Sequence, residues 1–214
     1  MLRKISFLLL LATAPAFARL TAPEPEQTAQ AAIEQVLQDF EDKKYDNALS
    51  QLEELQKARP SDPLILNLIG SVYTKKQNYQ KAERYFRESL EKQPGFFPAQ
   101  YNLGELLFLQ EKFPAAREHF QAMRASDARN ELLQFKVGLC DLQAGEIDRA
   151  KRVMNAIKYP GDSPAWYYGQ AALANKEGNA AKAREYLHGA KFVYGPEKTA
   201  LFDETFENLG IKLD

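Results

Sequence analysis

One spacing constrains the fold of this chain more than any other feature: small and bulky apolar residues recur together every 34 residues. The recurring sets are Gly70, Gly104 and Gly138, then Ala82, Ala116 and Ala150, then Phe86, Phe120 and Met154. A period of this length is typical of stacked supersecondary units, because one such unit is too small to bury its apolar faces alone.

The residues that recur explain how each unit packs. Glycine inside a helix costs about 1 kcal/mol relative to alanine, so a repeated glycine such as Gly70 needs a packing reason. Gly70 and Ala82 let two helices approach closely, and a bulky residue such as Phe86 fills the remaining space. Pro60 and Pro94 end the second helix of a unit. The pattern predicts two antiparallel helices in each unit.

Residues 63–96 carry the clearest copy of the unit. Its marked positions are Leu66, Ile69, Gly70, Tyr73, Ala82, Phe86, Ser89 and Pro94. This arrangement resembles the signature of the tetratricopeptide-repeat family, with leucine in place of the signature tryptophan and serine in place of the second small alanine. Both replacements are compatible in size with a packed core.

The same frame extends over most of the chain. We expect five copies, at residues 29–62, 63–96, 97–130, 131–163 and 164–197, of which the first is degenerate. Beyond them, Leu201, Phe202, Phe206 and Leu209 recur at helical spacing, and Gly210 follows as a stop. The resemblance implies an all-α solenoid of about five helix–turn–helix repeats, closed by a C-terminal capping helix within residues 198–214.

The first residues have a different character. Arg3 and Lys4 precede a short apolar run at residues 5–12, and an Ala-Phe-Ala sequence follows at residues 16–18. A basic start, a short apolar run and small residues at a cleavage site are typical of a secretory signal peptide. We expect cleavage after Ala18, a linker over residues 19–28, and a periplasmic or secreted mature protein. The alternative is an uncleaved membrane anchor.

Composition excludes several kinds of partner. The formal net charge of -1 supplies no basic field for nucleic-acid phosphates. No segment after the leader is apolar enough to span a membrane. Cys140 is the only cysteine, which excludes an intramolecular disulfide, and its apolar neighbours predict a buried core position.

The sequence contains few motifs typical of a catalytic or metal-binding site. His119 and His188 lie in different copies and form no close pair of metal ligands. The chain contains no nucleophile-elbow, phosphate-loop or D-x-D motif. We therefore expect no catalytic residues, no cofactor and no metal, and a protein that is not an enzyme. A hydrolase that acts on cell-wall glycan through two remote carboxylates is the less favoured alternative.

The family resemblance implies where a partner would bind. In tetratricopeptide repeats the first helix of each copy lines a concave groove, and its second, fifth, ninth, twelfth and thirteenth positions face a ligand. Ser71 stands where a carboxylate clamp would need asparagine, so such a clamp is not expected. The predicted groove residues are Asn67, Ser71, Lys75, Tyr101, Glu105, Phe108, Phe135, Leu139, Tyr168 and Asn175.

Aromatic side chains can anchor a peptide segment, and four of these residues are aromatic. The alternative is that the aromatic rings pack between adjacent helices or under the capping helix. The sequence thus favours a non-catalytic scaffold or adaptor of a bacterial cell envelope that binds a protein or peptide partner. A self-assembling homo-oligomer, built through the degenerate end copies, is the second hypothesis.

Overall fold

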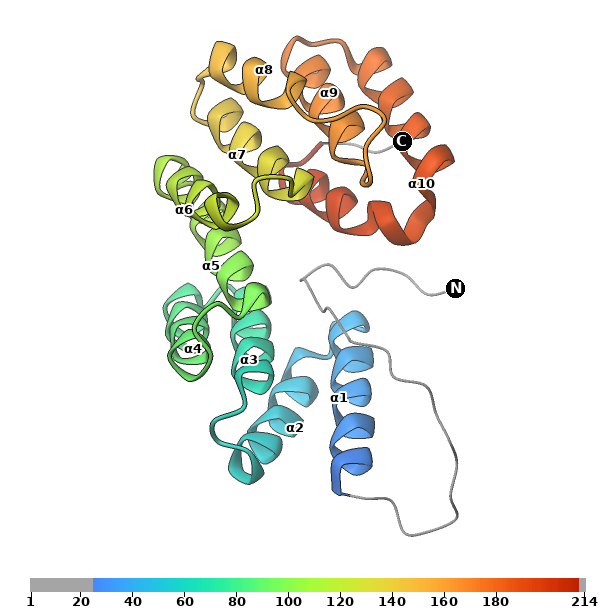
Figure 1. Ribbon diagram of the computed structural model, residues 1–214. Helices are drawn as coiled ribbons and strands as arrows, with labels where there is room; N and C mark the ends of the chain where they lie inside the picture. Colours follow the sequence, from blue (N-terminus) through green and yellow to red (C-terminus); the bar gives the residue numbers. More distant parts are fainter. Residues whose placement is uncertain (1–24, 212–214) are drawn as a thin grey trace. The chain divides into compact units, whose positions relative to one another are not determined.

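The computed structural model describes residues 25–211, with side chains from residue 29 onward. This part of the chain folds into consecutive α-helices joined by short turns (Figure 1). The all-α solenoid predicted from the repeat is confirmed. The helices form two compact units, divided between Leu106 and Leu107. The predicted leader, residues 1–18, lies outside the described residues.

Unit 1 holds two helix pairs and the beginning of a third. Its helix α1 begins inside the segment predicted as a linker, so residues 25–28 are helical. The core of the unit is apolar and draws residues from all five of its helices. The bounds are α1 Pro25–Glu41, α2 Tyr45–Ala58, α3 Pro63–Lys75, α4 Tyr79–Lys92 and α5 Phe97–Leu109, the last of which continues into unit 2.

Two of the repeated glycines, Gly70 and Gly138, lie where the helices of one pair touch. A Cβ atom added to Gly70 on α3 would lie 2.6 Å from Cε1 of Phe86 on α4. A Cβ atom on Gly138 would lie 2.8 Å from Cγ of Met154. Real Cβ contacts are longer than this, so each glycine is needed for the approach of its two helices. The close packing predicted from the 34-residue repeat is confirmed at both positions.

Unit 2 ends in a helix that changes direction. Within α10, Gly195 has φ 75° and ψ 170°, which breaks the helix into residues 180–194 and residues 196–208. Residues that carry a side chain rarely adopt this positive φ, which glycine reaches without steric cost. Pro196 suits the first turn of the second segment. We call residues 196–208 the C-terminal limb. The bounds are α6 Phe113–Ser126, α7 Glu131–Gln143, α8 Ile147–Asn155, α9 Ala165–Lys176 and α10 Ala180–Asn208.

Two further residues of unit 2 bear on the sequence predictions. Cys140 is free and buried, as predicted. Asp141 stands where the signature has tyrosine, and it is buried as an ion pair. Its Oδ1 lies 2.7 Å from Nε of Arg117 and 2.9 Å from Nε of Arg149. Burial of a carboxylate requires such cationic partners, which here join α6, α7 and α8.

Candidate functional site

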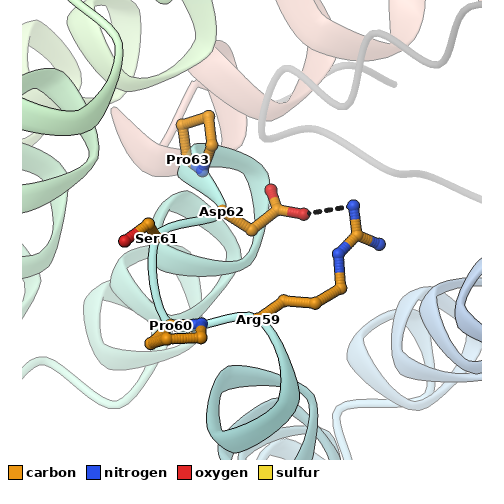
Figure 2. Close-up of a pocket in the computed structure, with 5 residues that line it drawn as sticks. All are labelled: Arg59, Pro60, Ser61, Asp62 and Pro63. Atoms are coloured by element: carbon orange, nitrogen blue, oxygen red, sulfur yellow. Dashed lines mark ion pairs between the residues drawn. The ribbon is translucent and has the colours of Figure 1, made fainter.

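The polar residues of α3 depend on how this helix begins. Asp62 caps it, because its Oδ1 accepts a hydrogen bond of 2.9 Å from the backbone N–H of Leu64. Arg59 holds the same carboxylate through an ion pair of 2.7 Å, and Pro63 opens the helix (Figure 2). A shallow hollow beside this turn is lined only by residues 59–63. We interpret the hollow as part of the turn that starts α3.

A row of polar side chains follows one side of α3. Asn67, Ser71 and Thr74 are separated by four and three residues, so they share a helix face. Ser71 Oγ donates to the backbone carbonyl of Asn67 at 3.0 Å, and Thr74 Oγ1 donates to that of Gly70 at 3.0 Å. All three side chains are buried, although the frame predicts a groove-facing position for each.

Asn102 on α5 joins this row. Its Nδ2 donates to Asn67 Oδ1 at 3.0 Å and lies 3.3 Å from Ser71 Oγ. Its own Oδ1 is buried and has no hydrogen-bond partner among the described residues. A buried acceptor without a donor costs about 1–3 kcal/mol. We call Asn67, Ser71 and Asn102 the polar face of unit 1.

The corresponding helices of unit 2 carry aromatic residues, and these are covered. Phe202 of the C-terminal limb lies between Phe135 on α7 and Tyr168 on α9, with ring centroids 5.2 and 5.0 Å away. Phe206 contacts Tyr168 edge to face at 5.2 Å. Aromatic pairs at these distances add to the stabilisation from burial itself. We call Phe135, Lys136 and Tyr168 the covered face of unit 2.

Polar contacts fix the register of the limb on the covered face. Lys136 Nζ donates to Thr205 Oγ1 at 2.7 Å, and the Tyr168 hydroxyl donates to Asp203. Burial, reinforced by the bond to Asp203, raises the pKa of Tyr168 well above its usual value. Lys191, which precedes Gly195 on α10, lies 3.8 Å from the Asp203 carboxylate. The limb is therefore held by specific polar groups as well as by apolar area.

The predicted groove residues differ in how deeply they are buried. Lys75 and Glu105 are half-buried, and Asn175 is exposed. The structure places Phe135 and Tyr168 beneath the C-terminal limb rather than in an open groove, which is the alternative that the sequence left open. A binding role for the set stays a prediction. The buried members of the set are Asn67, Ser71, Tyr101, Phe108, Phe135, Leu139 and Tyr168.

Sequence reasoning missed Asn102 and Lys136, which occupy the same position of consecutive copies. Both are buried, and each makes a polar contact that joins two helices. A signal was present: each stands alone as a polar residue between apolar neighbours, in Tyr-Asn-Leu and Phe-Lys-Val. A lone polar residue in an apolar run of a helix indicates a buried hydrogen bond.

Metal-ligating side chains do not cluster in the described part of the chain. No group of three or more histidine, cysteine, aspartate or glutamate side chains there could hold a metal ion. His119 lies on α6 and His188 on α10. Over the same residues, no helix combines the length and apolar character that crossing a membrane requires.

A comparison with protein-family models supports the assignment of the 34-residue repeat. A family model described as "Tetratricopeptide repeat" matches residues 35–95 and again residues 75–131. No curated protein sequence matches the chain.

Solved structures resemble the whole fold at low sequence identity. A thermophilic tetratricopeptide-repeat protein of Thermus thermophilus, TTC0263, is 18% identical and has a TM-score of 0.65, with 86% of this chain and 100% of that chain covered. MamA from Desulfovibrio magneticus RS-1 is 17% identical, with a TM-score of 0.57 and coverage of 77% and 94%. YrrB, described as having an unusual peptide-binding site, is 22% identical, with a TM-score of 0.50 and coverage of 83% and 92%. At this identity the likeness concerns the fold alone.

Proposed function

Because this chain is a member of the tetratricopeptide-repeat family, we propose that it is a non-catalytic adaptor of a bacterial cell envelope. In this proposal the first helices of the repeats in unit 1 bind a segment of a partner protein. Repeat solenoids suit this task, because their stacked helices present extended surfaces that are larger than a single helix pair.

The observation that carries the proposal is the difference between the two units. In unit 2 the covered face is filled by the chain's own limb. In unit 1, Lys75 and Glu105 are the predicted groove residues that are only partly buried. The polar face of unit 1 holds the helices that carry them, since Asn102 bonds α5 to α3.

The envelope location rests on the predicted leader. Arg3 and Lys4, the apolar run at residues 5–12 and the small residues Ala16 and Ala18 all support export. Mass spectrometry of the protein isolated from the periplasmic fraction tests this directly. We expect a mature chain that begins at Arg19. A chain that keeps residues 1–18 and stays in the cytoplasm would overturn this part of the proposal.

Site-specific photo-crosslinking in the native envelope tests the binding surface. A photoreactive residue at position 75 or 105 is expected to capture a partner protein. The matched control is position 91, because Glu91 is exposed on α4, outside the predicted groove. Capture of the same partner from position 91, but not from 75 or 105, would place binding on the other side of the unit and contradict the proposal.

A further inference from the structure

The structure supports a second interaction that is independent of the proposed adaptor role. We propose that the covered face of unit 2 is also an interface between two copies of this chain, in which the copies exchange their C-terminal limbs. Residues 196–208 of each copy then pack on α7 and α9 of the other.

The first reason is that the occupant and the face are already matched. Phe202 contacts Phe135 and Tyr168, while Thr205 and Asp203 accept hydrogen bonds from Lys136 and Tyr168. A second copy carries the same limb, so it offers the same rings and acceptors to the same face. Exchange therefore keeps every one of these contacts and needs no new complementary surface.

The second reason is the hinge. The limb is joined to the rest of α10 through Gly195, whose φ of 75° turns the chain back. Glycine reaches other backbone conformations without steric cost, so the limb can leave its own face by rotation at this residue. Pro196 prevents residues 180–208 from joining into one regular helix, because it has no N–H for the helical bond to Phe192.

The third reason is the surface beside the hinge. Phe192 is 92% exposed and Val193 is 56% exposed, and Tyr159 is the other large hydrophobic residue that the described part of the chain exposes. In an exchanged dimer the two connecting segments pass each other near the symmetry axis. Residues that precede the hinge then meet their counterparts in the second copy. Burial of Phe192 and Val193 there is a gain that the single chain lacks, and it offsets the loss of the intramolecular connection.

A complementation experiment on the mature chain tests the exchange. Phe206→Asp damages the limb but leaves the face intact. Tyr168→Asp damages the face, because the introduced carboxylate repels that of Asp203. It leaves the limb intact. We expect each variant alone to be monomeric by sedimentation velocity. An equimolar mixture is expected to form a 1:1 dimer, since the intact limb of one chain fits the intact face of the other.

Two further variants keep the result decisive if either carboxylate variant folds poorly. Deletion of Gly195 shortens the hinge, and we expect a dimer at all concentrations with its helical circular dichroism retained. Phe192→Ser is expected to raise the dissociation constant of the wild-type dimer at least about tenfold, since it removes apolar area from the new contact.

Other outcomes would overturn the proposal. One is a wild-type chain that remains monomeric up to millimolar concentration, with a Gly195 deletion that is also monomeric. Another is a wild-type dimer that Phe192→Ser leaves unchanged while the two carboxylate variants fail to pair, because that dimer would use a different surface.

Discussion

Asn102 and Lys136 stand at the same position of consecutive repeats, and both are buried on the first helix of their copy. The Nδ2 of Asn102 donates within the repeat array, to Asn67 and Ser71 on the preceding first helix. Lys136 instead reaches Thr205, which lies outside the array on the C-terminal limb. The same position thus ties helix to helix in unit 1 and helix to limb in unit 2.

The difference shows how one repeat frame supports two kinds of surface. Where the first helices carry small polar groups, these groups are buried and bond to one another. Where they carry Phe135 and Tyr168, the face is apolar and the fold supplies a limb to bury it. Four measurements test this difference between the units.

The largest effect is expected from Phe206→Ala in unit 2. Phe206 is fully buried against Tyr168, so its truncation should lower the free energy of unfolding by about 3–5 kcal/mol. The only tryptophan, Trp166, lies on α9 and reports unit 2 by fluorescence during urea denaturation. The matched control is Phe192→Ala on the exposed side of α10, with an expected change within about 0.5 kcal/mol. Equal losses in the two variants would mean that the limb is not a structural part of unit 2.

The next effect concerns the bond between Lys136 and Thr205. Thr205→Val keeps the shape of the side chain but removes an acceptor from a buried ammonium group, which should cost about 1.5–3 kcal/mol. The double variant Lys136→Met/Thr205→Val should recover part of this loss, because the ammonium group that needs the acceptor is then absent. Urea denaturation of Thr205→Val, Lys136→Met and the double variant measures the coupling. Additive losses would show that the two side chains do not act as a pair.

Alkaline pH should weaken unit 2 through Tyr168. Its pKa in the folded chain is raised above the ordinary value of about 10, so its contribution is complete below about pH 10 and is lost as the pH rises further. The free energy of unfolding should fall by up to about 1.4 kcal/mol per pH unit for this group. Tyr167, whose pKa is raised to about 12 first by its hydrogen bond with Tyr159, adds to the slope. Tyr168→Phe is therefore the control, and an unchanged slope in that variant would contradict the assignment.

The smallest effect is expected in unit 1. Asn102→Ala removes two donor contacts but also removes the buried Oδ1 that has no partner among the described residues. These opposing terms should leave a net loss of about 1 kcal/mol. Thermal unfolding followed by circular dichroism measures it. A loss as large as that of Phe206→Ala would show that the polar face is as essential to unit 1 as the limb is to unit 2.

The sequence predicted the internal packing of a repeat well, because that packing depends on residues within one period. Gly70 and Phe86 are sixteen residues apart in one copy, and their contact follows from side-chain size alone. The surroundings of the groove residues could not be predicted in the same way. The frame shows that Tyr168 faces away from its own second helix, but what covers it depends on Gly195, whose φ the sequence does not reveal.

The apolar spacing of Phe202 and Phe206 does not reveal which surface the last helix packs against. It predicts a buried face on the last helix, yet many apolar surfaces of the array could accept such a face. In the structure the limb packs on Phe135 and Tyr168, and Lys136, a polar residue in an apolar run, donates a hydrogen bond to it. A lone polar residue of this kind therefore adds information on long-range contacts to that of the apolar positions around it.

The direction in which a chain is synthesised gives the C-terminal limb a further consequence. Helices α7 and α9 are made before residues 202–206, so the growing chain holds Phe135 and Tyr168 uncovered until the limb follows. Because chains emerge at about 5–20 residues per second, this interval lasts on the order of seconds. During it, unit 2 presents an apolar face that a chaperone can bind, whereas unit 1 has already closed its polar contacts. Completion of the limb is thus the event that ends the dependence of the nascent chain on such help.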